Sequence, residues 1–183
     1  MTEIPGYVAG TWEIDPVHSE VSFTVRHMAV SKVRGRFDKF AGTFVTAEDP
    51  LASTVNVTVD ANSINTNNEQ RDGHVRSADF FEVENHPTWT FVSTGIKPDG
   101  DDYLLEGDLT IRGITKPATF KLEFGGIGPD AYGGTRAGFT ASTEITRKDY
   151  GVSFNGPIPG LPGHTILSEK VGVNLEIEAV LQA

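Results

Sequence analysis

Residues 20–27 read EVSFTVRH, and in this stretch polar and apolar side chains alternate one by one. Val21 and Phe23 share one parity, whereas Ser22 and Thr24 share the other. Successive side chains of a β-strand point to opposite faces of the sheet, so this alternation predicts a strand with one buried face. A helix is disfavoured because its apolar residues return every three or four positions.

The same alternation returns along most of the chain. Short turn sequences separate the alternating stretches, among them PDGD at residues 98–101 and paired glycines at 125–126. About eight such strands with short links predict an all-β fold, namely a single eight-stranded antiparallel up-and-down barrel of the lipocalin-like type. The further alternating stretches lie at residues 55–60, 119–124, 137–145 and 171–178, with shorter ones beginning at Trp89 and Leu105.

Three stretches depart from the alternation. Phe37 has one parity while Phe40 and Phe44 have the other, which predicts a β-bulge or a strongly bent strand between them. Residues 67–84 show no alternation and few β-branched side chains, so we expect a crossover there with one or two short helical turns. Residues 155–163 hold three prolines and three glycines and must be irregular; they form either a lid or rim of a site, or a structural wrap across one barrel end.

The composition is that of an ordinary globular protein, with 38% hydrophobic and 22% charged residues. A length of 183 residues suits one domain, which we expect to span residues 1–183. Lys and Arg number 15 against 25 Asp and Glu, so the net charge is −10 and disfavours nucleic acid as a partner. The absence of cysteine excludes disulfides, thiol catalysis and thiolate metal sites.

The first ten residues, MTEIPGYVAG, do not resemble a secretory signal, because they are mixed in character and carry Glu3. No run of about 18 apolar residues occurs that would predict a membrane-spanning helix. We therefore expect a cytoplasmic protein, or an exported one if a leader has been removed.

Short motifs follow one another in order along the chain, and a compatible last strand follows them. They are WEIDPVHS at residues 12–19, VSF at 21–23, VRGRF at 33–37 followed by Phe40 and Gly42, SINT at 63–66, RDGHVRS at 71–77, DFF at 79–81, Pro87 with Phe91, GDLTIRGITKP at 107–117 and RKDYG at 147–151. Together these motifs resemble the YceI-like, or polyisoprenoid-binding, family. One departure is Tyr150, which stands where that family often has phenylalanine.

The resemblance implies a lipocalin-like barrel with an elongated cavity for a polyisoprenoid, an isoprenoid quinone or a fatty-amide-like lipid. The physics is compatible with this, because a barrel of about eight strands encloses either a filled core or one ligand. The chain has 11 Phe and 2 Trp to line such a cavity, and apolar burial is worth roughly 25 cal/mol per Å². We therefore expect binding and carriage of a long-chain apolar ligand. The alternatives are a ligand-free stress-response or structural barrel, and an enzyme acting on a small apolar substrate.

We expect ligand contacts from inward side chains and from Arg71 or Arg147. His27 shares the apolar face of the first strand and is either a polar ligand contact or a core histidine. Arg71 or Arg147 either meets a diphosphate or quinone head group through forked N–H donors, or pairs with Asp72 or Asp149. The full expected set of ligand-binding residues is Phe23, Val25, His27, Phe37, Phe40, Phe80, Phe81, Trp89, Phe91, Arg71 and Arg147.

We predict no catalytic residues and no metal ligands, and hence no enzyme. Asp15, His18 and Ser19 have the side chains of a catalytic triad, but they lie in one short segment with nothing to form an oxyanion hole. We therefore interpret Asp15 and Ser19 as hydrogen-bonding residues at a strand entry. The five histidines show no HExxH spacing. No cofactor is expected apart from a bound isoprenoid or quinone-like lipid; transient membrane contact and homodimerisation are left open.

Overall fold

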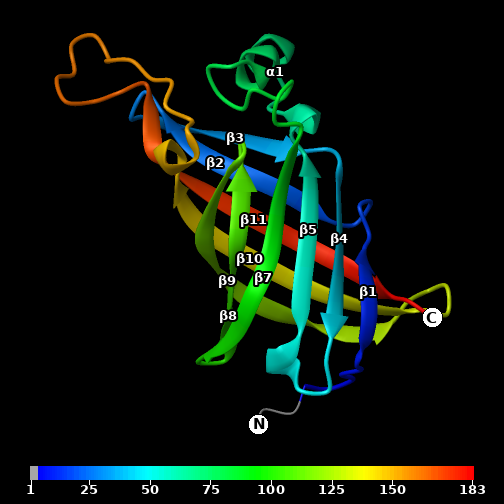
Figure 1. Ribbon diagram of the computed structural model, residues 1–183. Coiled ribbons are helices and arrows are strands. Elements are labelled where there is room, and N and C mark those ends of the chain that lie inside the picture. Colours follow the sequence, from blue (N-terminus) through cyan, green and yellow to red (C-terminus); the bar gives the residue numbers. More distant parts are fainter. Residues whose placement is uncertain (1–3) are drawn as a thin grey trace.

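The strands form one sheet that closes on itself, as seen in Figure 1, a computed structural model that describes residues 4–183. Residues 1–3, which the predicted domain 1–183 includes, lie outside the described residues. The closed ring is an eight-stranded antiparallel barrel in the order β1-β4-β5-β7-β8-β9-β10-β11, which confirms the predicted fold. The strands are β1 Gly10–Ile14, β2 Glu20–His27, β3 Ser31–Phe37, β4 Phe40–Thr46, β5 Thr54–Asp60, β6 Ile64–Asn65, β7 Thr88–Asp99, β8 Asp102–Ile111, β9 Ile114–Pro129, β10 Thr135–Thr146 and β11 Leu167–Leu181.

Three sides of the barrel each consist of two consecutive strands with a break between them. On the first side, β1 pairs with the end of β11, where Trp12 lies opposite Leu181, and β2 pairs with the earlier part of β11, where Phe23 lies opposite Val173. In the same way, β4 continues the line of β3 along the second side, and β6 continues the line of β5 along the third. Each side is therefore a long bent strand, and neighbours in the sequence are neighbours in the barrel.

The change of parity predicted near Phe37 corresponds to a break at Asp38 and Lys39, between β3 and β4. Phe37 lies opposite Val21 in one ladder, and Phe40 lies opposite Val59 in another. The two residues of the break restart the alternation, so aromatic side chains from both segments turn toward the interior. The irregularity expected from the sequence is thus confirmed as a bend between two strands.

Closure of the barrel depends on β1, which lies between β4 and β11. Trp12 in β1 is completely buried, and its indole Nε1 donates a hydrogen bond of 2.9 Å to Thr46 Oγ1. Buried tryptophans fill a large volume and commonly place their N–H on a partner in this way. Trp12 therefore helps to hold the first strand in register with β4.

The predicted crossover contains one short helix, α1 Glu69–Arg76, above one end of the barrel (Figure 1). Asn68 caps it, because its side-chain oxygen accepts a hydrogen bond of 2.9 Å from Arg71 N. Asp72 in the first turn is buried and accepts from Thr66 N at 2.9 Å. These contacts fix the helix to the segment that precedes it, and the expected helical turns between residues 67 and 84 are confirmed.

The connection between β10 and β11 is long and irregular. It begins with a 3-10 turn, Arg147–Tyr150, and continues as a narrow loop in which Pro157 bridges Thr165. The ring of Phe154 in this loop packs on Phe80 and His74 of the crossover, at centroid distances of 5.1 and 4.9 Å. The loop thus lies at the same barrel end as α1. No helix within residues 4–183 is long and apolar enough to cross a membrane.

Candidate ligand-binding site

The interior of the barrel contains a cavity of about 180 Å³, here called the barrel cavity. Its walls come from the inward faces of most strands. The side chains in them are mainly apolar, and serine, threonine, tyrosine and tryptophan supply the polar groups. Among the described residues no Asp, Glu, Lys, Arg or His lines it. The aromatic lining residues are Tyr7, Trp12, Phe23, Phe37, Phe44, Trp89, Phe91, Tyr103, Phe120, Phe124 and Phe139.

A second cavity, of about 250 Å³, lies at the end covered by α1 and the 147–166 connection, and is here called the crossover cavity. Its character differs, because charged and hydrogen-bonding side chains enter its wall. Within residues 4–183 no aspartate or glutamate lines it, although the chain as a whole carries a net charge of −10. The polar lining residues are His27, Thr66, Arg71, His74, Arg147 and Tyr150.

Aromatic rings stand where the two cavities adjoin. Phe23 and Trp89 line both, and the ring of Trp89 lies 4.7 Å from those of Phe37 and Phe81. Phe23 approaches the β3 backbone so closely that a Cβ on Gly35 would lie 2.4 Å from its ring, so a larger residue there would require the ring to move. The interior is therefore two cavities separated by side chains that rotate about single bonds.

Arg147 lies in the wall of the crossover cavity and is only 4% exposed. Its Nε donates to the Ser168 carbonyl oxygen and its Nη1 to the Val152 carbonyl oxygen, each at 2.9 Å. Its Nη2 is buried and has no hydrogen-bond partner among residues 4–183. Burial lowers the pKa of Arg147, and the charge of Glu169 opposes this shift. A guanidinium stays protonated at neutral pH, so this wall holds a positive charge with one unused donor nitrogen.

Trp89 supplies a second unused donor. Its Nε1 is buried and, like Arg147 Nη2, has no partner in the described part of the chain. Leaving a buried donor unpaired costs about 1–3 kcal/mol, so native proteins rarely do it without a reason. Trp89 and Arg147 both line the crossover cavity, so two side chains of its wall carry a buried donor without a protein partner.

Arg71 is held by Thr66 and not by the neighbouring carboxylate. Its Nε donates to Thr66 Oγ1 at 2.8 Å and its Nη2 to the Thr66 carbonyl oxygen at 2.6 Å. Asp72 instead accepts from the Thr66 hydroxyl and backbone N–H. The pairing of Arg71 with Asp72 that the sequence left open is therefore wrong, because Asp72 is engaged in fixing Thr66. Arg147 likewise binds carbonyl oxygens and not Asp149.

The residues expected from the sequence to contact a ligand come together around these two cavities, with one exception. They divide between the cavities according to their position along each strand. The barrel cavity is lined by Phe37 and Phe91. The crossover cavity is lined by Val25, His27, Arg71, Phe80, Phe81 and Arg147. Both cavities are lined by Phe23 and Trp89.

The exception is Phe40. It begins β4 directly after the Asp38–Lys39 break, lies opposite Val59, and packs against the core without lining either of these two cavities. Its parity alone placed it inside the barrel, but its position at the break keeps it at the edge of the core.

Sequence reasoning also missed lining residues. Phe139 lies in an alternating stretch and Trp12 in the first motif, so a signal existed for both. Tyr150 and Phe154 lie outside the regular strands, where periodicity gives no information about which way a side chain points. Residues from irregular connections therefore complete the crossover cavity.

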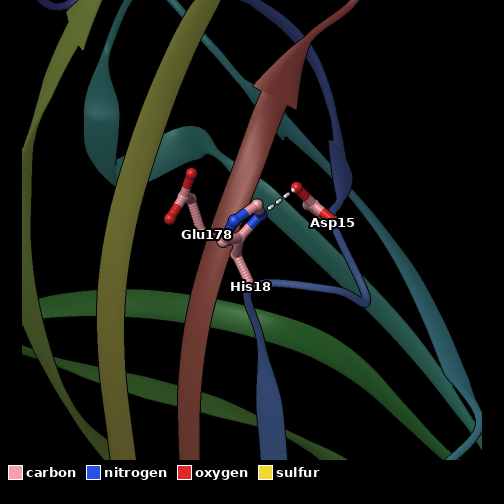
Figure 2. A group of neighbouring side chains, drawn as sticks. All are labelled: Asp15, His18 and Glu178. Atoms are coloured by element: carbon pink, nitrogen blue, oxygen red, sulfur yellow. Dashed lines mark hydrogen bonds and ion pairs between the residues drawn. The ribbon is translucent and has the colours of Figure 1, made fainter. Parts of the chain in front are cut away.

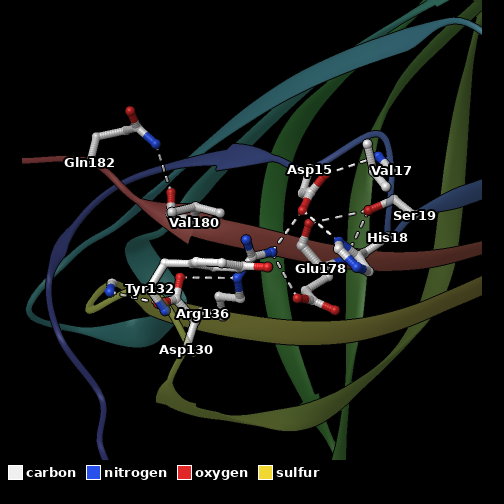
Figure 3. A network of polar contacts seen from close by, with 11 residues as sticks. Asp15, Val17, His18, Ser19, Asp130, Tyr132, Arg136, Glu178, Val180 and Gln182 are labelled. Atoms are coloured by element: carbon white, nitrogen blue, oxygen red, sulfur yellow. Dashed lines mark hydrogen bonds and ion pairs between the residues drawn. The ribbon is translucent and has the colours of Figure 1, made fainter.

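A cluster of ionisable side chains lies away from both cavities, at the break between β1 and β2 (Figure 2). Potential ligand atoms of Asp15, His18 and Glu178 all lie within 4.8 Å of one another. His18 Nδ1 is 2.8 Å from Asp15 Oδ2. Arg136 supplies the positive charge that a metal ion would bring, because its Nη1 donates to Asp15 Oδ2 at 2.7 Å and to Glu178 Oε1 at 2.8 Å (Figure 3).

The cluster joins β10 and β11 to the segment between β1 and β2. Arg136 in β10 also donates to Asp130 through Nε, at 3.1 Å, while Ser19 Oγ donates to the Glu178 carbonyl oxygen in β11 at 3.1 Å. Asp15 accepts from Val17 N at 2.9 Å. Asp15 and Ser19 thus form the strand-entry hydrogen bonds predicted from the sequence, and we assign the cluster a structural role.

Removing the charge of Asp15 is expected to destabilise the fold. Arg136 and His18, which hydrogen-bond to Asp15, hold the pKa of that carboxyl well below its usual value of 3.8. Because the pKa is lower in the folded chain, ionised Asp15 stabilises the fold above about pH 4, and this stabilisation is lost as the pH falls further. Urea denaturation of Asp15→Asn at about pH 7 should show a loss of about 1–2 kcal/mol. The difference from the unsubstituted protein should shrink near pH 3, and a difference that does not change with pH would contradict this assignment.

Known proteins match both the sequence and the barrel. The YceI-like domain model matches residues 12–179. Protein YceI of Escherichia coli O17:K52:H18 is 40% identical over 179 residues, covering 96% of this chain and 89% of that protein. BcnA of Burkholderia cenocepacia superimposes with a TM-score of 0.75 at 22% identity, covering 90% of this chain and 98% of that one. A polyisoprenoid binding domain of Saccharophagus degradans gives a TM-score of 0.71 at 19% identity, covering 93% and 98%.

At identities near 20% the two solved structures show a shared fold. The family model and the 40% identical relative carry more weight, because both extend over nearly the whole chain. On this ground, and in agreement with the motifs of its strands and crossover, the chain belongs to the YceI-like family.

Proposed function

We propose that this protein binds and carries a long-chain apolar ligand inside the barrel, with the apolar chain in the barrel cavity and its polar head in the crossover cavity. The observation that carries the proposal is the lining of the barrel cavity, which holds no charged side chain among the described residues. A water-filled site normally attracts polar residues, whereas pockets for apolar ligands are lined as this one is.

The size of the hydrophobic effect supports a long chain in particular. Transfer of about 300 Å² of apolar surface from water gains roughly 7.5 kcal/mol at 25 cal/mol per Å². Association itself costs several kcal/mol in lost translational and rotational freedom. A short apolar molecule therefore binds weakly, and affinity should rise with chain length until the cavities are filled.

The two unpaired donors support a polar head with acceptor oxygens. Arg147 Nη2 and Trp89 Nε1 both lack partners within residues 4–183, and both residues line the crossover cavity. A phosphate, a quinone carbonyl or an amide carbonyl would satisfy such donors. Arg147 is also positioned in advance, because two backbone carbonyl oxygens hold its guanidinium.

A carrier role is supported by the barrel cavity, which no Asp, Glu, Lys, Arg or His of the described chain lines. At the crossover cavity, His74 pairs with Asp79 at 2.7 Å between Nε2 and Oδ2, and its ring packs on Phe80 and Phe154. The fold is also shared with the Saccharophagus degradans protein described as a polyisoprenoid binding domain. That the protein needs no cofactor and acts in the cytoplasm stays a prediction from the sequence.

Intrinsic fluorescence offers a direct test, because both tryptophans of the chain, Trp12 and Trp89, line the barrel cavity. Titration with geraniol, farnesol and geranylgeraniol should change the emission with an affinity that increases from the shortest chain to the longest. If none of the three alcohols changes the emission, or if affinity does not depend on chain length, the proposal fails.

The role of Arg147 is tested by comparing two ligands with the same chain. Arg147→Met is expected to weaken binding of geranylgeranyl phosphate about tenfold, since a hydrogen bond to a charged group is worth about 1.5–3 kcal/mol. Binding of geranylgeraniol should change less than twofold. The matched control is Arg36→Met, because Arg36 is an exposed arginine of β3 that lines neither cavity. Equal affinity of the unsubstituted protein for the phosphate and the alcohol would exclude this role even if the variant folds poorly.

A further inference from the structure

Exposed apolar side chains gather at the barrel end that holds the crossover cavity. Val30, in the turn between β2 and β3, is 82% exposed, and Leu161 and Phe154 in the 147–166 connection are also exposed. The turn and the connection lie side by side, because Met28 N donates to the Ile166 carbonyl oxygen at 2.7 Å (Figure 1). We call the three residues Val30, Phe154 and Leu161 the apolar rim.

The two segments that carry the apolar rim differ in charge from the chain as a whole. Residues 21–37 contain four arginines and lysines and no acidic residue, and residues 150–168 contain no Asp, Glu, Lys or Arg. The whole chain, by contrast, has a net charge of −10. The rim is therefore an apolar surface beside a positive one on a negatively charged protein.

The positive residues also lie close to one another. Arg26 in β2 lies directly opposite Lys32 in β3, and Arg34 follows two residues later in the same strand. All three are exposed, and no ion pair joins any of them to an acidic residue in the described part of the chain. Like charges directly opposite on an antiparallel pair are unfavourable, so an anionic surface placed against them would relieve the repulsion.

The apolar rim is continuous with the crossover cavity. Phe154 belongs to both, since its ring lines the cavity and is 39% exposed. His27, Ile166 and Leu167, which flank the turn and the connection, line the same cavity. A ligand leaving the cavity at this end thus passes along the apolar side chain of Phe154.

We propose that this end of the barrel docks on a lipid bilayer that contains anionic lipids. Val30, Leu161 and Phe154 enter the interface between head groups and acyl chains, and Arg26, Lys32 and Arg34 lie against the anionic head groups. Apolar side chains combined with neighbouring cations are the two signals that bind proteins to such surfaces. The passage of a ligand between bilayer and barrel rests on the function proposed above, whereas docking itself does not require an occupied cavity.

A bilayer fits this surface better than a second protein. The rim consists of a turn and a narrow loop that project from the barrel end (Figure 1), and projecting side chains enter a fluid interface more readily than they pack on a rigid partner. The negative charge of the remaining surface also favours one orientation, because it is repelled from an anionic bilayer.

The test is co-sedimentation of the full chain with vesicles of phosphatidylcholine alone and of phosphatidylcholine mixed with phosphatidylglycerol. We expect binding to the mixed vesicles that is at least tenfold tighter than to the neutral ones and that weakens with added salt. The double variant Val30→Asp with Leu161→Asp should lose at least tenfold in this binding. Val17→Asp is the matched control, because Val17 is 83% exposed in the segment between β1 and β2, outside the rim (Figure 3), and its binding should stay within twofold.

Absence of binding by the unsubstituted protein, equal binding to both kinds of vesicle, or equal loss in the Val17 variant would overturn the proposal. A dimer in size-exclusion chromatography that the rim variant dissociates, without any binding to vesicles, would assign the rim to a second copy and also overturn it. Titration of the same samples with geranylgeraniol, followed by tryptophan emission, reports the cavity separately, so a failure of docking and a failure of ligand binding are told apart.

Discussion

Replacing Val173 by tryptophan is expected to weaken binding of geranylgeraniol about 70-fold while the barrel stays folded. Val173 in β11 lines both cavities, at the place where they adjoin. A larger side chain there blocks the path between the cavities and displaces about 100 Å² of ligand contact. That loss corresponds to about 2.5 kcal/mol, which is about 70-fold in affinity. The measurement is displacement of a fluorescent fatty acid by the alcohol.

A matched substitution on the outer surface separates blockage from general damage. Val92 in β7 is 49% exposed and lines neither of the two cavities. Val92→Trp should leave the affinity within twofold. If Val173→Trp folds and binds geranylgeraniol as tightly as the unsubstituted protein, the ligand does not occupy the junction of the cavities.

Replacing Trp12 by alanine is expected to produce the largest loss of stability, about 3–5 kcal/mol in the free energy of unfolding. The side chain is completely buried, and β1, which carries it, closes the ring between β4 and β11. The substitution leaves a cavity beside this closure and removes the hydrogen bond to Thr46. Urea denaturation followed by circular dichroism measures the loss.

Trp12→Phe distinguishes volume from hydrogen bonding. Phenylalanine fills most of the space but cannot donate to Thr46 Oγ1, so the loss should be near 1 kcal/mol plus a small packing term. Losses of equal size for Trp12→Ala and Trp12→Phe would show that the hydrogen bond, and not the buried volume, holds the barrel closed.

The arrangement of strands follows from the sequence to a large extent because it has a short-range cause. Alternation in EVSFTVRH and its later copies reports which face of each strand is buried, and each side of the barrel pairs with the side that follows it along the chain. The two-residue break at Asp38 and Lys39 can also be recognised in the sequence, because the parity of the apolar residues changes between Phe37 and Phe40. Up-and-down topology thus needs little information beyond the order of the strands.

The site is less predictable, because it depends on contacts between distant segments. Alternation places Phe23 and His27 inside the barrel but does not say that Phe23 reaches both cavities while His27 reaches one. Phe40, which the sequence also predicts as a ligand contact, packs against the core and lines neither of the two cavities. Tyr150 and Phe154 come from an irregular connection, where the backbone follows no period.

The unpaired state of Arg147 could not be predicted either. The sequence shows an arginine next to Lys148 and Asp149, which suits a surface turn. Only the packing of the 3-10 turn against β11 buries the guanidinium and leaves Nη2 without a partner within residues 4–183. Burial of this kind is a property of the assembled barrel and not of the local sequence.

The aromatic rings between the cavities have a consequence for ligand entry. A chain that occupies both cavities must turn Phe23 and Trp89 away from their present contacts with Phe37 and Phe81. Rotations of this kind about side-chain bonds are small compared with opening of the sheet. We therefore expect the strands to keep their register when the ligand binds.

Native mass spectrometry of the protein, freshly purified and then incubated with geranylgeraniol, tests most directly whether the barrel interior accepts an apolar chain. We predict the mass of one chain plus one apolar molecule, and loss of the added mass in Val173→Trp but not in Val92→Trp. A mass equal to the bare chain under all of these conditions would contradict the account, because it would mean that the aromatic side chains fill the interior and do not give way.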